Sequence, residues 1–145
     1  MSLSAADKKL VQESWDKVSK PSFADAGERV FLKLFQRNES TKAHFKKFKD
    51  IPSDQLAGQA VVRDHGEKVC KVLDDFIKGL DGSGDEAVKK VGRMHKGLGM
   101  SNEQIDQMKG AIIEVLADAG FGDANYKGAW GKLWDRFMAV HRAAY

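Results

Sequence analysis

The sequence predicts an all-α fold, and three observations support this prediction. Apolar residues recur at intervals of three and four along almost the whole chain, which is the spacing of an amphipathic helix. The two prolines, Pro21 and Pro52, stand between periodic stretches, where they interrupt no helix. Three serines, Ser4, Ser22 and Ser101, are each followed three residues later by Asp or Gln, which is the pattern of a capping box at a helix start.

Local sequence signals also predict where successive helices begin and end. Pro52, Ser53 and Asp54 predict the start of the third and longest one, and the segment 81–85, with two glycines and two aspartates, predicts the turn after it. Glycine pairs at 97 and 99 and at 120 and 122 end the fourth and fifth helices. The apolar stripes run from Val11 to Val18, Gly27 to Phe35, Val62 to Leu80, Val88 to His95, Ile105 to Leu116 and Trp130 to His141.

Composition places the chain among soluble globular proteins. It has 145 residues, 42% of them hydrophobic, so we expect one domain over residues 1–145 with its own core. The net charge of +3 is spread along the chain, which argues against nucleic-acid binding. No apolar run is long enough to span a membrane, and the start is polar rather than signal-like. A single cysteine, Cys70, fits a reducing compartment, and we expect a cytoplasmic protein.

Sequence motifs for hydrolysis or phosphoryl transfer are missing from the chain. It contains no HExxH, CxxC, P-loop or GxGxxG motif. Two histidines, His65 and His95, lie instead on the apolar stripes of two consecutive helices. Each of them alone would be interpreted as an ordinary core histidine. Together they can face each other across an apolar slot, which would place one imidazole on each side of a flat iron macrocycle. His44 and His141 are assigned no role.

The chain resembles the globin family along nearly all of its length, and the invertebrate intracellular globins in particular. Three kinds of residue carry the resemblance: the tryptophan of the first helix, two glycines at a helix crossing, and the phenylalanine and two histidines around the cofactor. In this sequence they are Trp15, Gly27, Gly66, Phe45, His65 and His95. The resemblance implies a globin fold of about eight helices around a pocket for haem b, with His95 as the proximal iron ligand.

The resemblance also implies which residues border the haem and the bound gas. His65 is the expected distal hydrogen-bond donor, with Phe31 above and Val69 beside the ligand position. The expected haem contacts are Phe45, Phe48, His65, Val69, Val91, His95, Leu98, Met100, Ile105 and Ile112. Lys47 is a candidate partner for a haem propionate.

The function that this resemblance implies is reversible oxygen binding for transport or storage, without enzymatic turnover. Carbon monoxide and nitric oxide are further expected ligands, and assembly with copies of itself or with other globin chains is open. Three alternatives also stay open. They are a haem redox enzyme acting on nitric oxide or peroxide, a six-coordinate globin in which His65 also ligates iron, serving as a sensor or electron-transfer protein, and a helical binding module without haem.

Overall fold

The computed structural model describes residues 3–145, and within that range it contains helices and no strand. This confirms the all-α prediction. The α-helices are α1 (Ala5–Val18), α2 (Phe23–Arg37), α3 (Ala60–Lys78), α4 (Asp85–Gly97), α5 (Asn102–Asp106), α6 (Met108–Asp118) and α7 (Ala124–Ala144). Two short 3-10 helices, η1 (Glu39–His44) and η2 (Ser53–Gln55), lie between α2 and α3.

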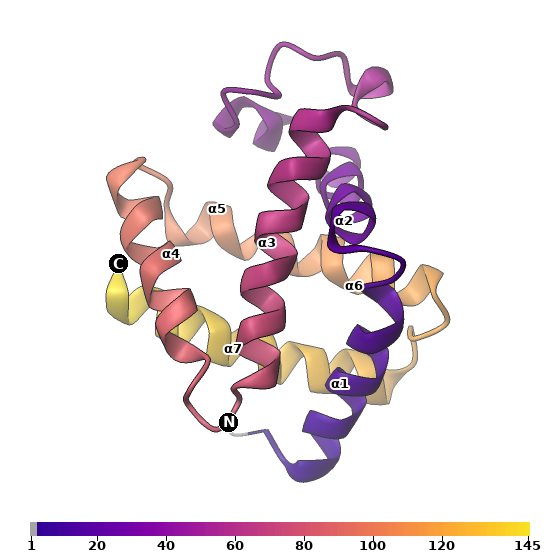
Figure 1. The fold of residues 1–145 in the computed structure, drawn as a ribbon, viewed down its shortest axis with the longest axis vertical. Coiled ribbons are helices and arrows are strands. Elements are labelled where there is room, and N and C mark those ends of the chain that lie inside the picture. The colour runs from indigo at the N-terminus through magenta and orange to yellow at the C-terminus, as the bar shows by residue number, and fades with distance from the viewer. Residues whose placement is uncertain (1–2) are drawn as a thin grey trace.

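The longer helices pack against one another in crossed pairs. Figure 1 shows α3 running along the long axis of the molecule, with the segment that holds η1 and η2 at one end of it. The most extensive pairing is that of α2 with α3, and α4 and α1 each pack on α7. Helices α3 and α4, which carry the two histidines singled out from the sequence, are also in contact with each other.

The crossing of α2 and α3 depends on two glycines. A Cβ atom added to Gly27 would lie 2.2 Å from the backbone of Gly66, and one added to Gly66 would lie 2.6 Å from the backbone of Gly27. The two helices therefore touch backbone to backbone, which only glycine permits. Arg63 strengthens the same interface, because its guanidinium reaches Asp25 at 2.8 Å and Glu28 at 3.5 Å.

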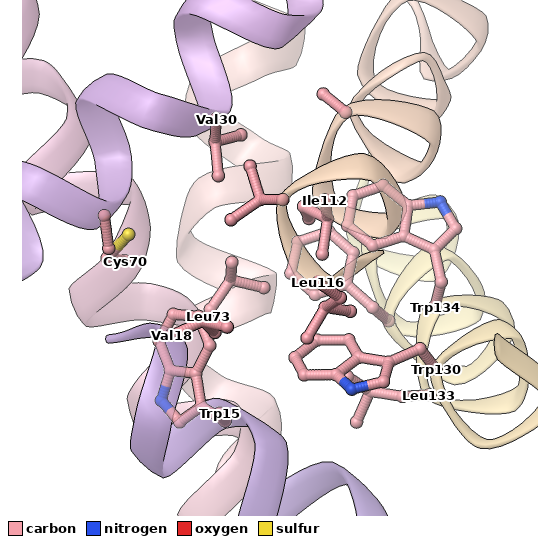
Figure 2. Close-up of a cluster of buried hydrophobic side chains, with 14 of the residues drawn as sticks. Trp15, Val18, Val30, Cys70, Leu73, Ile112, Leu116, Trp130, Leu133 and Trp134 are labelled. Atoms are coloured by element: carbon pink, nitrogen blue, oxygen red, sulfur yellow. The ribbon is translucent and has the colours of Figure 1, made fainter. Parts of the chain in front are cut away.

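The hydrophobic core lies where α1, α3, α6 and α7 converge. Figure 2 shows Trp15, Leu73, Leu116 and Trp130 grouped there, each from a different one of these helices. The indole N–H groups are hydrogen-bonded despite their burial: Trp15 donates to Asp74 at 3.0 Å and Trp130 donates to the buried Ser14 hydroxyl at 2.8 Å. Satisfying these donors removes most of the cost of burying them.

Two of the three expected capping boxes are complete. At Ser4 and at Ser101 the serine hydroxyl accepts a hydrogen bond from the backbone N–H three residues later. The side chain of that later residue, Asp7 or Gln104, accepts from the backbone N–H of the serine. At Ser22 only half of the pattern forms. The Ser22 hydroxyl accepts from the N–H of Asp25, but the Asp25 carboxylate accepts from that hydroxyl and pairs with Arg63 instead of returning to the cap backbone. The prediction of a full box there was wrong, because a tertiary ion pair competes for the carboxylate.

Two helix boundaries also differ from the sequence prediction. Residues 53–55 form only a 3-10 turn, and α3 begins at Ala60. Gly58 has a φ of 82°, which is left-handed and ends any right-handed helix that starts at Ser53. The helix expected from about Asn102 is divided into α5 and α6 at Gln107. The ψ angle of Gln107, −22°, is typical of a 3-10 turn rather than an α-helix.

Candidate functional site

His65 lies on α3 inside a group of phenylalanine rings. The centroid of its imidazole is 5.4 Å from that of Phe31 on α2, 5.5 Å from Phe45 and 5.6 Å from Phe48. Phe45 and Phe48 follow η1 and approach the imidazole at nearly right angles, with interplanar angles of 83° and 87°. Phe31 and His65, expected beside the bound gas, are therefore in contact with Phe45 and Phe48, expected beside the haem, and the three phenylalanines form an aromatic wall around the imidazole.

The environment of His65 keeps its ring neutral. Burial lowers the pKa of His65 below its ordinary value, and the positive charges of Lys68 and Lys47 lower it further. A neutral imidazole has one N–H donor and one nitrogen acceptor. At neutral pH the ring is thus able to donate a hydrogen bond without bringing a positive charge into the phenylalanine wall.

His95 lies on α4 and is held from behind by a third histidine. Its Nδ1 is 2.8 Å from Nε2 of His141 on α7, and the Nδ1 of His141 is 2.7 Å from Oδ1 of Asn102. Burial lowers the pKa of His95 to about 4, and the charged forms of His141 and His65 contribute to the shift. Among residues 3–145 no group forms a hydrogen bond with the Nε2 of His95, so this nitrogen is not engaged by another side chain.

The residues expected around the haem and the bound gas fall into two groups, some buried in the core and others partly or largely open to solvent. Phe31, Phe48 and Ile112 are buried, and Ile112 belongs to the cluster drawn in Figure 2. Leu98 is 66% exposed at the end of α4. Five apolar side chains are only partly buried although they belong to helices or turns next to the histidines; they are Phe45, Val69, Val91, Met100 and Ile105.

This pattern of exposure fits a flat apolar cofactor. Apolar side chains that stay partly open to solvent are typical of ligand-binding surfaces, and one of them, Phe45, contacts the half-buried imidazole of His65. Neutral imidazole is a suitable ligand for haem iron. The donor chemistry and the apolar surroundings therefore both fit haem.

Sequence reasoning missed two residues next to this site. His141 is completely buried and Asn102 starts α5, and they join α4, α5 and α7 behind His95. The register of His141 on the apolar stripe of the last helix, one turn after Phe137, was the available signal. It indicates burial, but it does not identify the partner, which lies 46 residues away in the sequence.

Comparison with known proteins identifies the family. The family model described as Globin matches residues 28–141, which include both histidines and every helix from α3 to α6 in full. The chain therefore belongs to the globin family, and membership implies a haem-binding protein. The arrangement of α2, α3 and α4 around two imidazoles is in keeping with that membership.

Individual relatives are similar over almost the full chain. Hemoglobin subunit alpha-D of Coturnix japonica is 32% identical over 143 residues, which cover 95% of this chain and 92% of that protein. Globin CTT-IIIA of Chironomus thummi thummi is 30% identical, with 96% and 89% covered, and myoglobin of Cyprinus carpio is 29% identical, with 89% and 87% covered. Among solved structures, a Drosophila melanogaster globin superimposes with a TM-score of 0.84 at 29% identity, with 97% of this chain and 94% of that chain covered.

Within residues 3–145 no helix combines the length and the apolar character needed to cross a bilayer.

Proposed function

We propose that this chain, as a single globin domain over residues 1–145, binds molecular oxygen reversibly at a ferrous haem b. The observation that carries the proposal is the pair of half-buried neutral imidazoles on α3 and α4. One of them has a free Nε2 backed by a hydrogen bond, and the other stands in an aromatic wall. Relatives named haemoglobin and myoglobin support the same function.

His95 is the residue that would hold the iron. Its Nδ1 is engaged by His141, so the ring can bind a metal only through Nε2. The lowered pKa of His95 keeps the ring neutral throughout the neutral pH range, and with its one proton on Nδ1, facing His141, the Nε2 would carry the lone pair. Haem iron held by His95 would supply the site at which a diatomic gas binds.

His65 would act on the opposite side as the hydrogen-bond donor. The N–H of a neutral His65 would donate a hydrogen bond to a bound diatomic gas that carries partial negative charge. Hydrogen bonds to charged groups contribute about 1.5–3 kcal/mol, which corresponds to roughly one to two powers of ten in affinity. Carbon monoxide is less polarised and gains less from the same donor, so His65 favours oxygen.

The apolar side chains would keep the site dry. Phe31 is fully buried and contacts both Phe45 and His65, so water is excluded from the wall behind the imidazole. Exclusion of water and of a second haem slows the oxidation of ferrous iron. Val69, one helical turn from His65 on α3, extends the apolar surface beside the ligand position.

We also place the protein in the cytoplasm and outside the class of enzymes. The one cysteine, Cys70, is a buried free thiol, which fits a reducing compartment. The relatives named haemoglobin and myoglobin support a carrier or a store rather than a catalyst of nitric oxide or peroxide turnover.

The test is a repeated oxygen titration of the reduced protein, followed by absorption spectroscopy. We expect one haem per chain, a five-coordinate deoxy spectrum and several cycles of binding and release with little oxidation. A six-coordinate low-spin spectrum before any gas is added would instead support iron ligation by His65. Rapid consumption of nitric oxide or peroxide would support a redox enzyme, and a colourless protein would support a helical module without haem.

A further inference from the structure

Three polar side chains from three helices form a continuous hydrogen-bonded chain that starts at the proposed iron ligand. His95 of α4 meets His141 of α7 at 2.8 Å, and His141 meets Asn102 of α5 at 2.7 Å. The two imidazole centroids are 5.1 Å apart. The chain ends at Asn102, the first residue of α5.

The middle residue of this chain is rigidly held. His141 has no exposed surface, and its ring is stacked between Phe137, at 6.3 Å between centroids and 19°, and Tyr145, at 5.9 Å and 29°. The Tyr145 hydroxyl is itself tied to the backbone carbonyl of Met100. Helix α4 comes very near, since a Cβ atom on Gly92 would lie 2.9 Å from the carbonyl oxygen of His141. This close approach lets the two imidazoles meet directly.

The direction of the hydrogen bonds follows from the chemistry of Asn102. Its Oδ1 only accepts, so the Nδ1 of His141 carries the proton and its Nε2 is left as an acceptor. The Nδ1–H of His95 then donates to that Nε2, and the Nε2 of His95 retains its lone pair. The reverse direction would put a proton on Nε2 of His95, and a protonated nitrogen cannot bind a metal.

We propose that His141, oriented by Asn102, is a positioning residue for His95: it selects the tautomer that exposes the Nε2 lone pair and fixes the plane of the ring. This inference rests on the proposed function, in which His95 ligates iron. The partner of a metal-bound histidine is commonly a carboxylate, a backbone carbonyl or water. A second, fully buried imidazole is a neutral partner that solvent cannot replace.

The first measurement needs no cofactor. In protein prepared without haem, the nitrogen-15 NMR spectrum of the imidazoles should show His141 protonated at Nδ1 and His95 protonated at Nδ1. Asn102→Leu should remove the preference at His141, because no acceptor then faces its Nδ1. Protonation of His141 at Nε2 in the unsubstituted protein would overturn the proposed direction of the chain.

The second measurement is the iron–histidine stretching frequency of the reduced, haem-loaded protein, obtained by resonance Raman spectroscopy. His141→Phe keeps a ring between Phe137 and Tyr145 but removes the acceptor, so we expect a lower frequency. We also expect haem transfer to an excess of a haem-free acceptor globin to become roughly 10- to 100-fold faster, the usual effect of losing such a partner. His141→Gln places an amide oxygen near the same position and should recover most of both properties.

Two further variants separate positioning from a structural contribution. Asn102→Asp makes the acceptor at the end of the chain anionic, so the frequency should rise above that of the unsubstituted protein; this variant also keeps the inference testable if His141→Phe does not fold. Phe137→Leu is the matched control, because it removes a ring that stacks on His141 without removing a hydrogen bond. Its frequency should be unchanged.

The outcomes distinguish the two proposals. Suppose that the unsubstituted protein binds haem and that its iron–histidine stretching frequency equals that of the His141→Phe and His141→Gln variants. The positioning role is then wrong, and the proposed function stands. If the unsubstituted protein binds no haem, the proposed function and this inference both fail.

Discussion

Replacing Gly27 with alanine should force α2 and α3 apart at the place where their backbones touch. The added Cβ would lie 2.2 Å from the carbonyl carbon and Cα of Gly66, whereas real Cβ contacts essentially never fall below 3.0 Å. The obstacle is backbone rather than the end of a flexible side chain. The helices must therefore separate by at least 0.8 Å, the difference between these two distances.

The energetic cost can be bounded from this geometry. Overpacking a core costs about 1–3 kcal/mol, and a contact between two backbones belongs at the upper end, about 3 kcal/mol. Alanine is preferred over glycine inside a helix by about 0.5–1 kcal/mol, which offsets part of this cost. We expect Gly27→Ala to lower the free energy of unfolding by about 2 kcal/mol, a large fraction of the 5–15 kcal/mol typical of a small protein.

Urea unfolding of the haem-loaded protein, followed by circular dichroism, measures this change. Gly131→Ala is the matched control, because Gly131 lies inside α7 and no atom is within 4 Å of an added Cβ. The same substitution should there raise the free energy of unfolding by about 0.5–1 kcal/mol. Equal stability changes in the two variants would refute the argument that the α2–α3 crossing requires glycine.

Three further predictions concern individual side chains. His65→Leu removes the proposed donor and should accelerate oxygen release in stopped-flow experiments by roughly 10- to 100-fold while haem stays bound; an unchanged rate would exclude the hydrogen bond. Ser14→Ala leaves the buried N–H of Trp130 without its acceptor and should cost about 1–3 kcal/mol in urea unfolding, so an unshifted midpoint would contradict it. Burial raises the pKa of the Cys70 thiol to about 12, so at about pH 8 it should react with thiol reagents only after denaturant unfolds the chain; fast labelling of the native protein would show that the thiol is accessible.

The helices could largely be predicted from the sequence because their causes are local. The register of Val11, Trp15 and Val18, for example, depends only on residues within α1, and all three side chains are buried as the stripe requires. The incomplete capping box at Ser22 shows where a distant residue decides instead. The carboxylate of Asp25 is diverted by Arg63 of another helix, which no pattern around Ser22 can indicate.

The candidate site divides in the same way. Periodicity alone placed His65 and His95 on apolar helix faces, and the family resemblance supplied their expected roles. The partner of His95 could not be predicted, because the contact with His141 depends on how closely α4 approaches α7 in three dimensions. Asn102 is the first residue of α5, and the sequence around it indicates only that Ser101 caps this helix, not that Asn102 contacts a histidine.

Haem binding by a His95→Gly variant, with and without added imidazole, tests whether His95 holds the iron. Loss of this side chain should release the haem or leave it loosely bound, and free imidazole, which can occupy the space of the missing ring, should restore a five-coordinate deoxy spectrum. His44→Gly, at an exposed histidine whose ring contacts only Gln104 among hydrogen-bonding groups in residues 3–145, should keep its haem. A His95→Gly protein that retains haem with an unaltered spectrum would show that another residue is the proximal ligand.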